Sequence, residues 1–187
     1  MLLPIPGILI AIVTFPGVII HELAHQIFCY LRRVPVYQVK YFQPRNPCGY
    51  VVHAPSESPG TNFIISIGPF IVNTILGALI LLPASIEMSE FGLLNDGLGF
   101  LPGLRLVFIY WLGISIAMHA FPSTGDAKNL VSSILKNKDV HILIKILVAP
   151  VVGLIYLGAF GSIIWLDLGY GILIATLLPK LIALFMW

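Results

Sequence analysis

The sequence predicts an all-α polytopic membrane protein with a small β-hairpin between its first two spans. Of its 187 residues, 58% are hydrophobic and only 10% are charged, and the mean hydropathy is +1.00. A water-soluble domain carries about a quarter charged residues, so this composition indicates a chain embedded in a bilayer. Because one span needs about 20 apolar residues, the apolar runs suffice for about four to five transmembrane helices.

The overall charge and the cysteine content exclude other classes of protein. The formal net charge is only +2 and there are two cysteines, Cys29 and Cys48. This excludes a disordered chain, a nucleic-acid binder and a small disulfide-stabilised secreted domain. We predict one membrane-embedded domain over residues 1–187, with the lipid bilayer as a partner and no nucleic acid.

Charged residues and prolines separate the apolar runs and so set the predicted spans. Arg32 and Arg33 end the first run, and the second ends near Pro83. Pro16 and Gly17 are expected to kink the first span. The last run is the weakest, because it could form a re-entrant helix broken at Pro179. The predicted spans are residues 5–31, 62–82, 104–120, 142–165 and 168–187.

Two segments outside the spans have patterns of their own. Within residues 36–53, apolar and polar side chains alternate from Val36 to Phe42, and a second short apolar run covers Tyr50 to His53. Turn-forming residues separate the two runs, which predicts a β-hairpin. Residues 127–141 contain lysines within an apolar pattern and predict an amphipathic helix at the membrane interface.

Basic residues in short loops predict the orientation, because Lys and Arg favour the cytoplasmic side. The hairpin segment and the loop after the third span carry such residues, whereas residues 84–103 contain no Lys or Arg. We therefore expect the N-terminus outside and the hairpin toward the cytoplasm. The basic residues are Arg32, Arg33, Lys40, Arg45, Lys128, Lys136 and Lys138.

The segment His21-Glu22-Leu23-Ala24-His25 predicts a metal site. Residues four apart lie on one face of a helix, so the two histidines can bind one metal ion while Glu22 stands near its water. Ionisable residues within an apolar run are costly in lipid and indicate function. The alternative is that these side chains only form hydrogen bonds between helices.

A catalytic zinc site normally has three protein ligands, so a third must come from elsewhere. Asp126 is the first candidate, because the predicted topology brings it to the same membrane face as the end of the first span. Its alternative role is to cap a helix that begins near Ala127. His119 and His53 are rival ligands, and either could instead hydrogen-bond to a ligand.

These motifs resemble the site-2 protease family of intramembrane zinc metalloproteases. The first motif is His21 to His25, and the second corresponds to residues 119–127, with His119 where the family usually has Asn and Ala127 where it has Gly. Between them, Gly49-Tyr50-Val51 and Gly68-Pro69 followed by Asn73 resemble further family motifs. The resemblance covers residues 15–129.

The resemblance implies that the protein hydrolyses a peptide bond in or near a transmembrane segment of a membrane-protein substrate. Zn²⁺ would be bound by His21, His25 and Asp126, with Glu22 as the catalytic acid–base residue. Asn73, His119 and His53 are candidates for contacting a ligand or the substrate. The hairpin edge could bind the unwound substrate by strand addition. The alternatives are a catalytically silent relative that binds membrane proteins and, with less support, a transporter.

Overall fold

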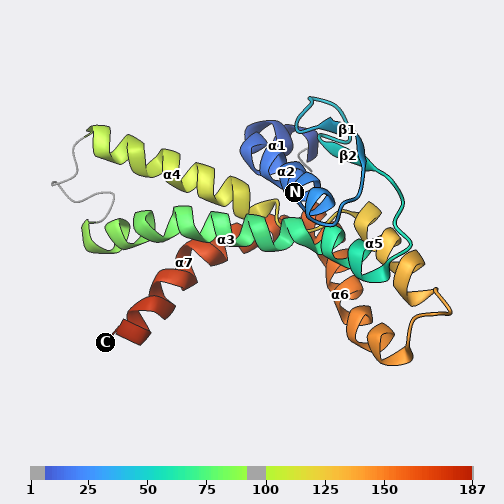
Figure 1. Cartoon of the computed structure of the whole chain (residues 1–187). Helices are drawn as coiled ribbons and strands as arrows, with labels where there is room; N and C mark the ends of the chain where they lie inside the picture. Colours follow the sequence, from blue (N-terminus) through green and yellow to red (C-terminus); the bar gives the residue numbers. More distant parts are fainter. Residues whose placement is uncertain (1–6, 92–99, 187) are drawn as a thin grey trace.

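A computed structural model describes residues 7–91 and 100–186 as a set of helices beside a two-stranded sheet (Figure 1). The predicted fold class, an all-α membrane protein with a small hairpin, is confirmed. The elements are α1 (Gly7–Val13), α2 (Phe15–Leu31), β1 (Val36–Lys40), β2 (Tyr50–His53), α3 (Pro59–Phe91), α4 (Phe100–Met118), α5 (Thr124–Leu130), a π-helical turn (Val131–Leu135), α6 (Ile142–Gly161), a 3₁₀ turn (Ser162–Ile164) and α7 (Leu166–Met186).

The first predicted span is bent rather than continuous. Its described part forms α1 and α2, whose axes differ by 89° at Thr14. Pro16 lies in the first turn of α2, where it has no amide hydrogen to donate and its ring excludes the carbonyl of residue 12. The expected kink at Pro16 is thus a full right-angle turn, which separates the helix with the histidines from the chain before it.

The second predicted span is longer than the sequence indicated. Helix α3 has 33 residues and continues through both Pro69 and Pro83, so the end expected near Pro83 is wrong. One missing hydrogen bond does not stop a long apolar helix that is packed against its neighbours. Of the loop expected at residues 84–103, the first part extends α3 and the last part starts α4, while 92–99 lie outside the described residues.

The hairpin forms as predicted, although β1 is shorter than the expected strand. Its strands pair antiparallel, with Val36 opposite His53 and Lys40 opposite Tyr50, and the register shifts between Val36 and Gln38. The Tyr41 hydroxyl donates to the Gln26 side chain of α2. The ring of Phe42 contacts Phe15 at the start of α2 with 5.9 Å between centroids. These contacts hold the hairpin along α2.

The chain after α4 departs from its predicted boundaries. The expected interfacial helix over residues 127–141 begins earlier, with α5, and its helical part ends at Leu135. The fourth span ends at Gly161 instead of residue 165. Of the two alternatives for the last run, a helix broken at Pro179 is not formed, because α7 continues through that residue. In the described chain, α3, α4 and α6 are long and apolar enough to cross a membrane, and the bent α1–α2 pair would be a fourth span.

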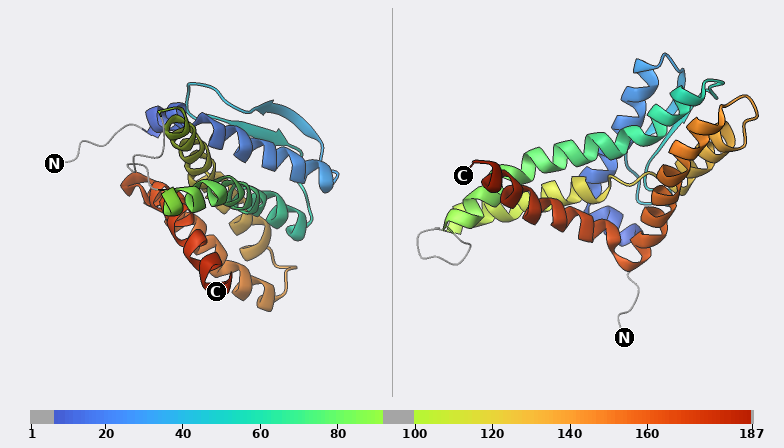
Figure 2. Two further views of the ribbon diagram at one scale, coloured as in Figure 1. Left: turned by 90° about the vertical axis from the view of Figure 1, so that its left-hand side faces the viewer. Right: turned by 90° about the horizontal axis from the view of Figure 1, so that it is seen from below.

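Helix α3 lies at the centre of the molecule and packs against α2, α4 and α7. Figure 2 shows α6 and α7 meeting at a sharp corner and then diverging, so that α6 points away from the α3–α4–α7 bundle, while α5 packs against both α6 and α3. The apolar cluster between α5 and α6 is built from Ala127, Leu130, Ile134, Val148, Val152 and Ile155. The segment from His119 to Asp126 bridges the two groups of helices and meets α2 there.

Candidate metal centre

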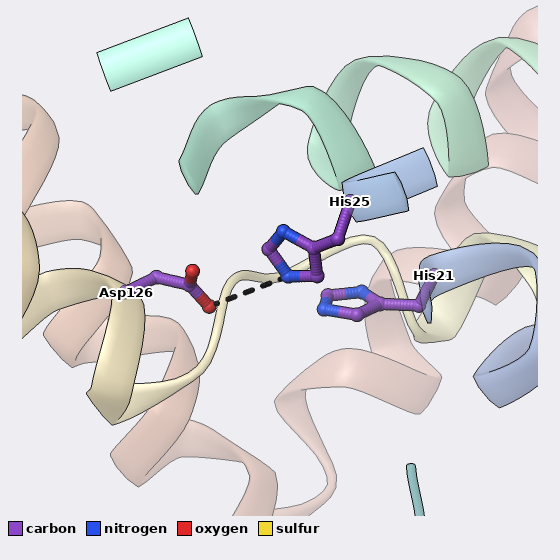
Figure 3. Close-up of side chains that lie close together, drawn as sticks. All are labelled: His21, His25 and Asp126. Atoms are coloured by element: carbon purple, nitrogen blue, oxygen red, sulfur yellow. Dashed lines mark ion pairs between the residues drawn. The ribbon is translucent and has the colours of Figure 1, made fainter. Parts of the chain in front are cut away.

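Two helices bring together three potential metal ligands. His21 and His25 lie one turn apart on α2, with their rings edge-to-face at a centroid distance of 4.9 Å. Asp126, in the first turn of α5, faces them (Figure 3). One ligand atom from each residue can be chosen so that all three lie within 4.8 Å of one another. The predicted convergence of Asp126 with the two histidines is therefore present.

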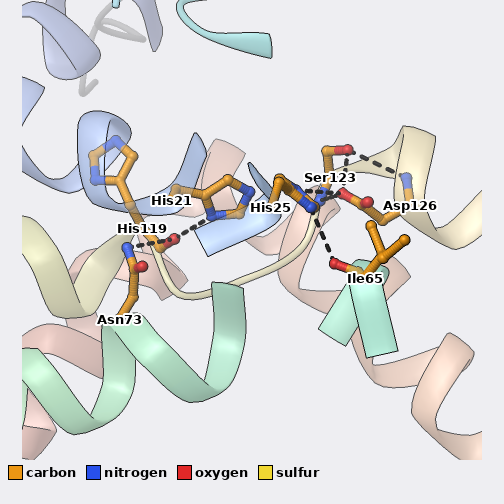
Figure 4. A network of polar contacts seen from close by, with 7 residues as sticks. All are labelled: His21, His25, Ile65, Asn73, His119, Ser123 and Asp126. Atoms are coloured by element: carbon orange, nitrogen blue, oxygen red, sulfur yellow. Dashed lines mark hydrogen bonds and ion pairs between the residues drawn. The ribbon is translucent and has the colours of Figure 1, made fainter. Parts of the chain in front are cut away.

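Hydrogen bonds to main-chain carbonyls orient both imidazole rings. Nδ1 of His21 lies 2.7 Å from the carbonyl oxygen of His119, and Nδ1 of His25 lies 3.0 Å from that of Ile65 (Figure 4). A carbonyl oxygen only accepts, so each Nδ1 carries a hydrogen and each Nε2 keeps its lone pair. Both rings thus hold the tautomer in which Nε2 can bind a metal ion.

Asp126 is not the N-cap that the sequence offered as its alternative role, but the third residue of α5, and it closes the capping box of that helix. Its Oδ2 accepts hydrogen bonds from the Ser123 amide at 2.9 Å and the Ser123 hydroxyl at 2.6 Å, and the Ser123 Oγ in turn accepts from the Asp126 amide. Ser123 is therefore the N-cap, and α5 begins at Thr124 rather than near Ala127. The same Oδ2 lies 3.7 Å from His25 Nε2. The capping box holds the carboxylate toward the histidines.

Glu22 lines the same cavity as the three potential ligands. This cavity measures about 290 Å³ and is also lined by the hairpin residues Gly49 and Tyr50. A Cβ atom at Gly49 would lie 2.6 Å from Cγ of Glu22, so only glycine lets the hairpin loop pass this close. Glu22 is 9% exposed, and Asp126 lines the same cavity.

The rival ligands His119 and His53 lie outside the group of three. The His119 ring lies on the far side of His21 from His25 (Figure 4), and its Nδ1 bonds to the carbonyl of Ser115 at 3.0 Å. It lines a neighbouring cavity of about 260 Å³, which also reaches Glu22 and Asp167. His53 lines the cavity of Glu22, and its Nδ1 bonds to the carbonyl of Ala54.

Asn73 lies behind the site rather than in it. Its side chain is fully buried, and its amide nitrogen lies 3.1–3.2 Å from the carbonyl oxygens of Gly17, Ile116 and His119. From the sequence, the ring of His119 was the candidate for contacting a ligand, whereas in the structure its main-chain carbonyl contacts His21. The sequence did not reveal that the carbonyl of Ile65 contacts His25 or that Ser123 is the N-cap of α5. Pro69, four residues after Ile65, is the one signal that could have revealed the free Ile65 carbonyl.

The chemistry of this group fits a zinc ion. Two imidazole nitrogens and one carboxylate oxygen form a donor set typical of catalytic zinc, with one position left for water or substrate. Ligands at about 2.1 Å in a tetrahedron lie about 3.4 Å apart, and the 3.7 Å between His25 Nε2 and Asp126 Oδ2 is close to this.

No protein-family model matches the chain, and neither a curated protein nor a solved structure matches it significantly. The class therefore rests on the fold and the site alone: a polytopic helical membrane protein with a partly buried cluster of potential metal ligands.

Proposed function

We propose that this protein is an intramembrane zinc metalloprotease that hydrolyses a peptide bond in or near a transmembrane segment of another membrane protein. One observation carries the proposal. His21, His25 and Asp126 converge with both Nε2 atoms free, and Glu22 lines the cavity that they share. Hydrogen bonding between helices alone would not require this donor set around one point.

Zinc, bound by His21, His25 and Asp126, would act as a Lewis acid that activates water and polarises the scissile carbonyl. Glu22 accepts the proton of the attacking water and passes it to the nitrogen of the leaving amine as the carbon–nitrogen bond breaks. The two histidines would bind zinc through Nε2, because Nδ1 of each ring donates to a carbonyl. The low exposure of Glu22 limits competing contacts with bulk water.

The hairpin supports a transmembrane protein as the substrate. A helical segment hides its carbonyls in its own hydrogen bonds, so it must unwind before cleavage. Strand β2 lines the cavity through Tyr50, Val51 and His53, and β1 pairs with only one of its edges. The other edge of β2 offers main-chain donors and acceptors to an extended substrate. With the hairpin and the active-site end on the cytoplasmic side, cleavage occurs near that face.

The proposal is tested with purified protein in detergent or liposomes. We expect about one zinc ion per chain by mass spectrometry, and chelator-sensitive cleavage of a panel of single-span test substrates. Glu22→Gln should lower the cleavage rate by about 10²- to 10⁴-fold, because the proton acceptor is lost, while zinc content stays unchanged.

Two results would contradict the proposal. Full cleavage by Glu22→Gln would exclude the assigned acid–base role. Zinc binding without cleavage of any substrate in the panel would favour the alternative, a catalytically silent relative that binds membrane proteins. His141→Gln is a suitable control, because His141 caps α6 away from the cluster.

A further inference from the structure

Helix α3 supports the two imidazoles at two points, directly at His25 and through the His119 carbonyl at His21, and each point depends on an unusual residue of that helix. The first is Pro69, which lies inside α3. In an α-helix the carbonyl of residue i accepts from the amide of residue i+4, and proline has no amide hydrogen. The carbonyl of Ile65 therefore has no partner in the regular helix pattern.

The freed carbonyl of Ile65 is the one that accepts from His25. Nδ1 of His25 lies 3.0 Å from it, in a place where Ile65 is 1% exposed and water does not compete. Gly68 permits the contact, because a Cβ atom there would overlap the ring of Phe28 on α2. Gly68 thus lets α2 approach α3, and Pro69 leaves an acceptor facing the histidine.

The second point is Asn73, one turn further along α3. Its amide nitrogen contacts the carbonyl of His119 at 3.2 Å, and His21 Nδ1 contacts the same oxygen at 2.7 Å. The carbonyl lies just after the end of α4, where carbonyls lack helical partners. By holding this oxygen, Asn73 fixes the group that orients His21 (Figure 4).

We propose that Pro69 and Asn73 are positioning residues of the metal centre: Pro69 frees the Ile65 carbonyl that orients His25, and Asn73 holds the His119 carbonyl that orients His21. The inference deepens the proposed function and rests on it where metal binding is concerned. It explains why α3 contains a fully buried Asn73 and an internal Pro69: both help to orient the two histidines. Neither residue touches the metal or the substrate.

Pro69→Ala is the sharpest test, because it adds a competing donor without removing any polar group. The new amide hydrogen at residue 69 would bind the Ile65 carbonyl, and His25 would lose its partner. Since alanine favours helix and proline opposes it, the helix itself is not weakened. We expect zinc affinity to fall by about 10- to 100-fold, the range for partners of metal ligands, with little change in the thermal midpoint of the metal-free protein.

A matched variant separates this effect from general changes in α3. Pro83→Ala also restores an amide hydrogen inside α3 but lies far from the histidines. It should bind zinc within about twofold of the unchanged protein. Asn73→Leu should lower affinity in the same range as Pro69→Ala.

Nitrogen-15 NMR of the histidine rings in metal-free protein gives a readout that needs no zinc. The unchanged protein should show His25 protonated at Nδ1, and Pro69→Ala should show a mixture of tautomers. Unaltered tautomers and zinc affinity in Pro69→Ala, or an equal loss in Pro83→Ala, would overturn the inference while leaving the proposed function intact. If tautomers shift as expected but the unchanged protein binds no zinc, the proposed function fails and the orienting role stands.

Discussion

The carboxylates at the two ends of the α3–α4 bundle differ in their partners. At the distal end, Glu87 of α3 forms an ion pair with Arg105 of α4, and the arginine side chain is 58% exposed. At the α2 end, Glu22 and Asp126 line one cavity, and the Asp126 side chain is 13% exposed against 26% for Glu87. The distal carboxylate has an arginine as its partner, whereas no lysine or arginine of the described residues forms an ion pair with Glu22 or Asp126. Under the proposed function, zinc would supply the positive charge at the second cluster.

Removing the charge of Asp126 should lower zinc affinity more than removing a charge at the distal end. Asp126→Asn keeps the shape of the side chain and an oxygen that can accept from Ser123, but it replaces a carboxylate ligand by a weaker amide. We expect zinc affinity to fall by more than about 100-fold, exceeding the effect of changing a partner of a ligand. Competition with a fluorescent chelator measures this affinity.

Ser123→Ala separates the cap from the ligand. It removes the hydroxyl that contacts Asp126, at a cost of about 1 kcal/mol in helix stability, but leaves the carboxylate in place. The fall in zinc affinity should be much smaller than for Asp126→Asn. Equal losses in the two variants would mean that Asp126 acts only through the capping box.

Changing the remaining histidines should have a smaller effect than Asp126→Asn on metal binding. His119→Gln alters a ring that points away from the cluster, and His53→Gln alters a ring that bonds to its neighbour's carbonyl. Each variant should retain zinc within about tenfold of the unchanged protein, the lower bound for partners of ligands. If either variant strips the metal while Asp126→Asn retains it, the assignment of the third ligand is wrong.

The smallest effect is expected at the distal end. Glu87→Gln removes the same charge as Asp126→Asn, but from an exposed pair whose contribution to stability is below about 1 kcal/mol. Zinc affinity should not change, and the thermal midpoint should shift by no more than a few degrees. A large loss of zinc in Glu87→Gln would show that the carboxylates act through overall charge, and the contrast between the two ends would disappear.

The sequence predicted those parts of the site that depend on local spacing. His21 and His25 are four residues apart on one helix, which fixes their shared face, and alternation of side chains revealed the hairpin. Asp126 was placed by topology, since the ends of two spans meet at one membrane face. Its interaction with Ser123 was missed because α5 begins three residues earlier than the sequence indicated.

The parts that the sequence did not predict depend on tertiary packing. Pro16 indicated a kink, but the 89° turn requires the packing of α2 against α3 and α4. Pro83 and Pro179 have the same local signal as Pro16, yet the helices continue through them. Likewise, a proline shows which carbonyl is freed, but only the fold shows that Ile65 faces His25.

The central claim is that His21, His25 and Asp126 bind one metal ion beside Glu22. The most direct test is an anomalous difference map measured at the zinc absorption edge on crystals of the purified protein. One peak should lie among Nε2 of His21, Nε2 of His25 and a carboxylate oxygen of Asp126, each at about 2.0–2.2 Å. A map without a peak there, or with the peak bound by His53 or His119 in place of Asp126, would contradict the account.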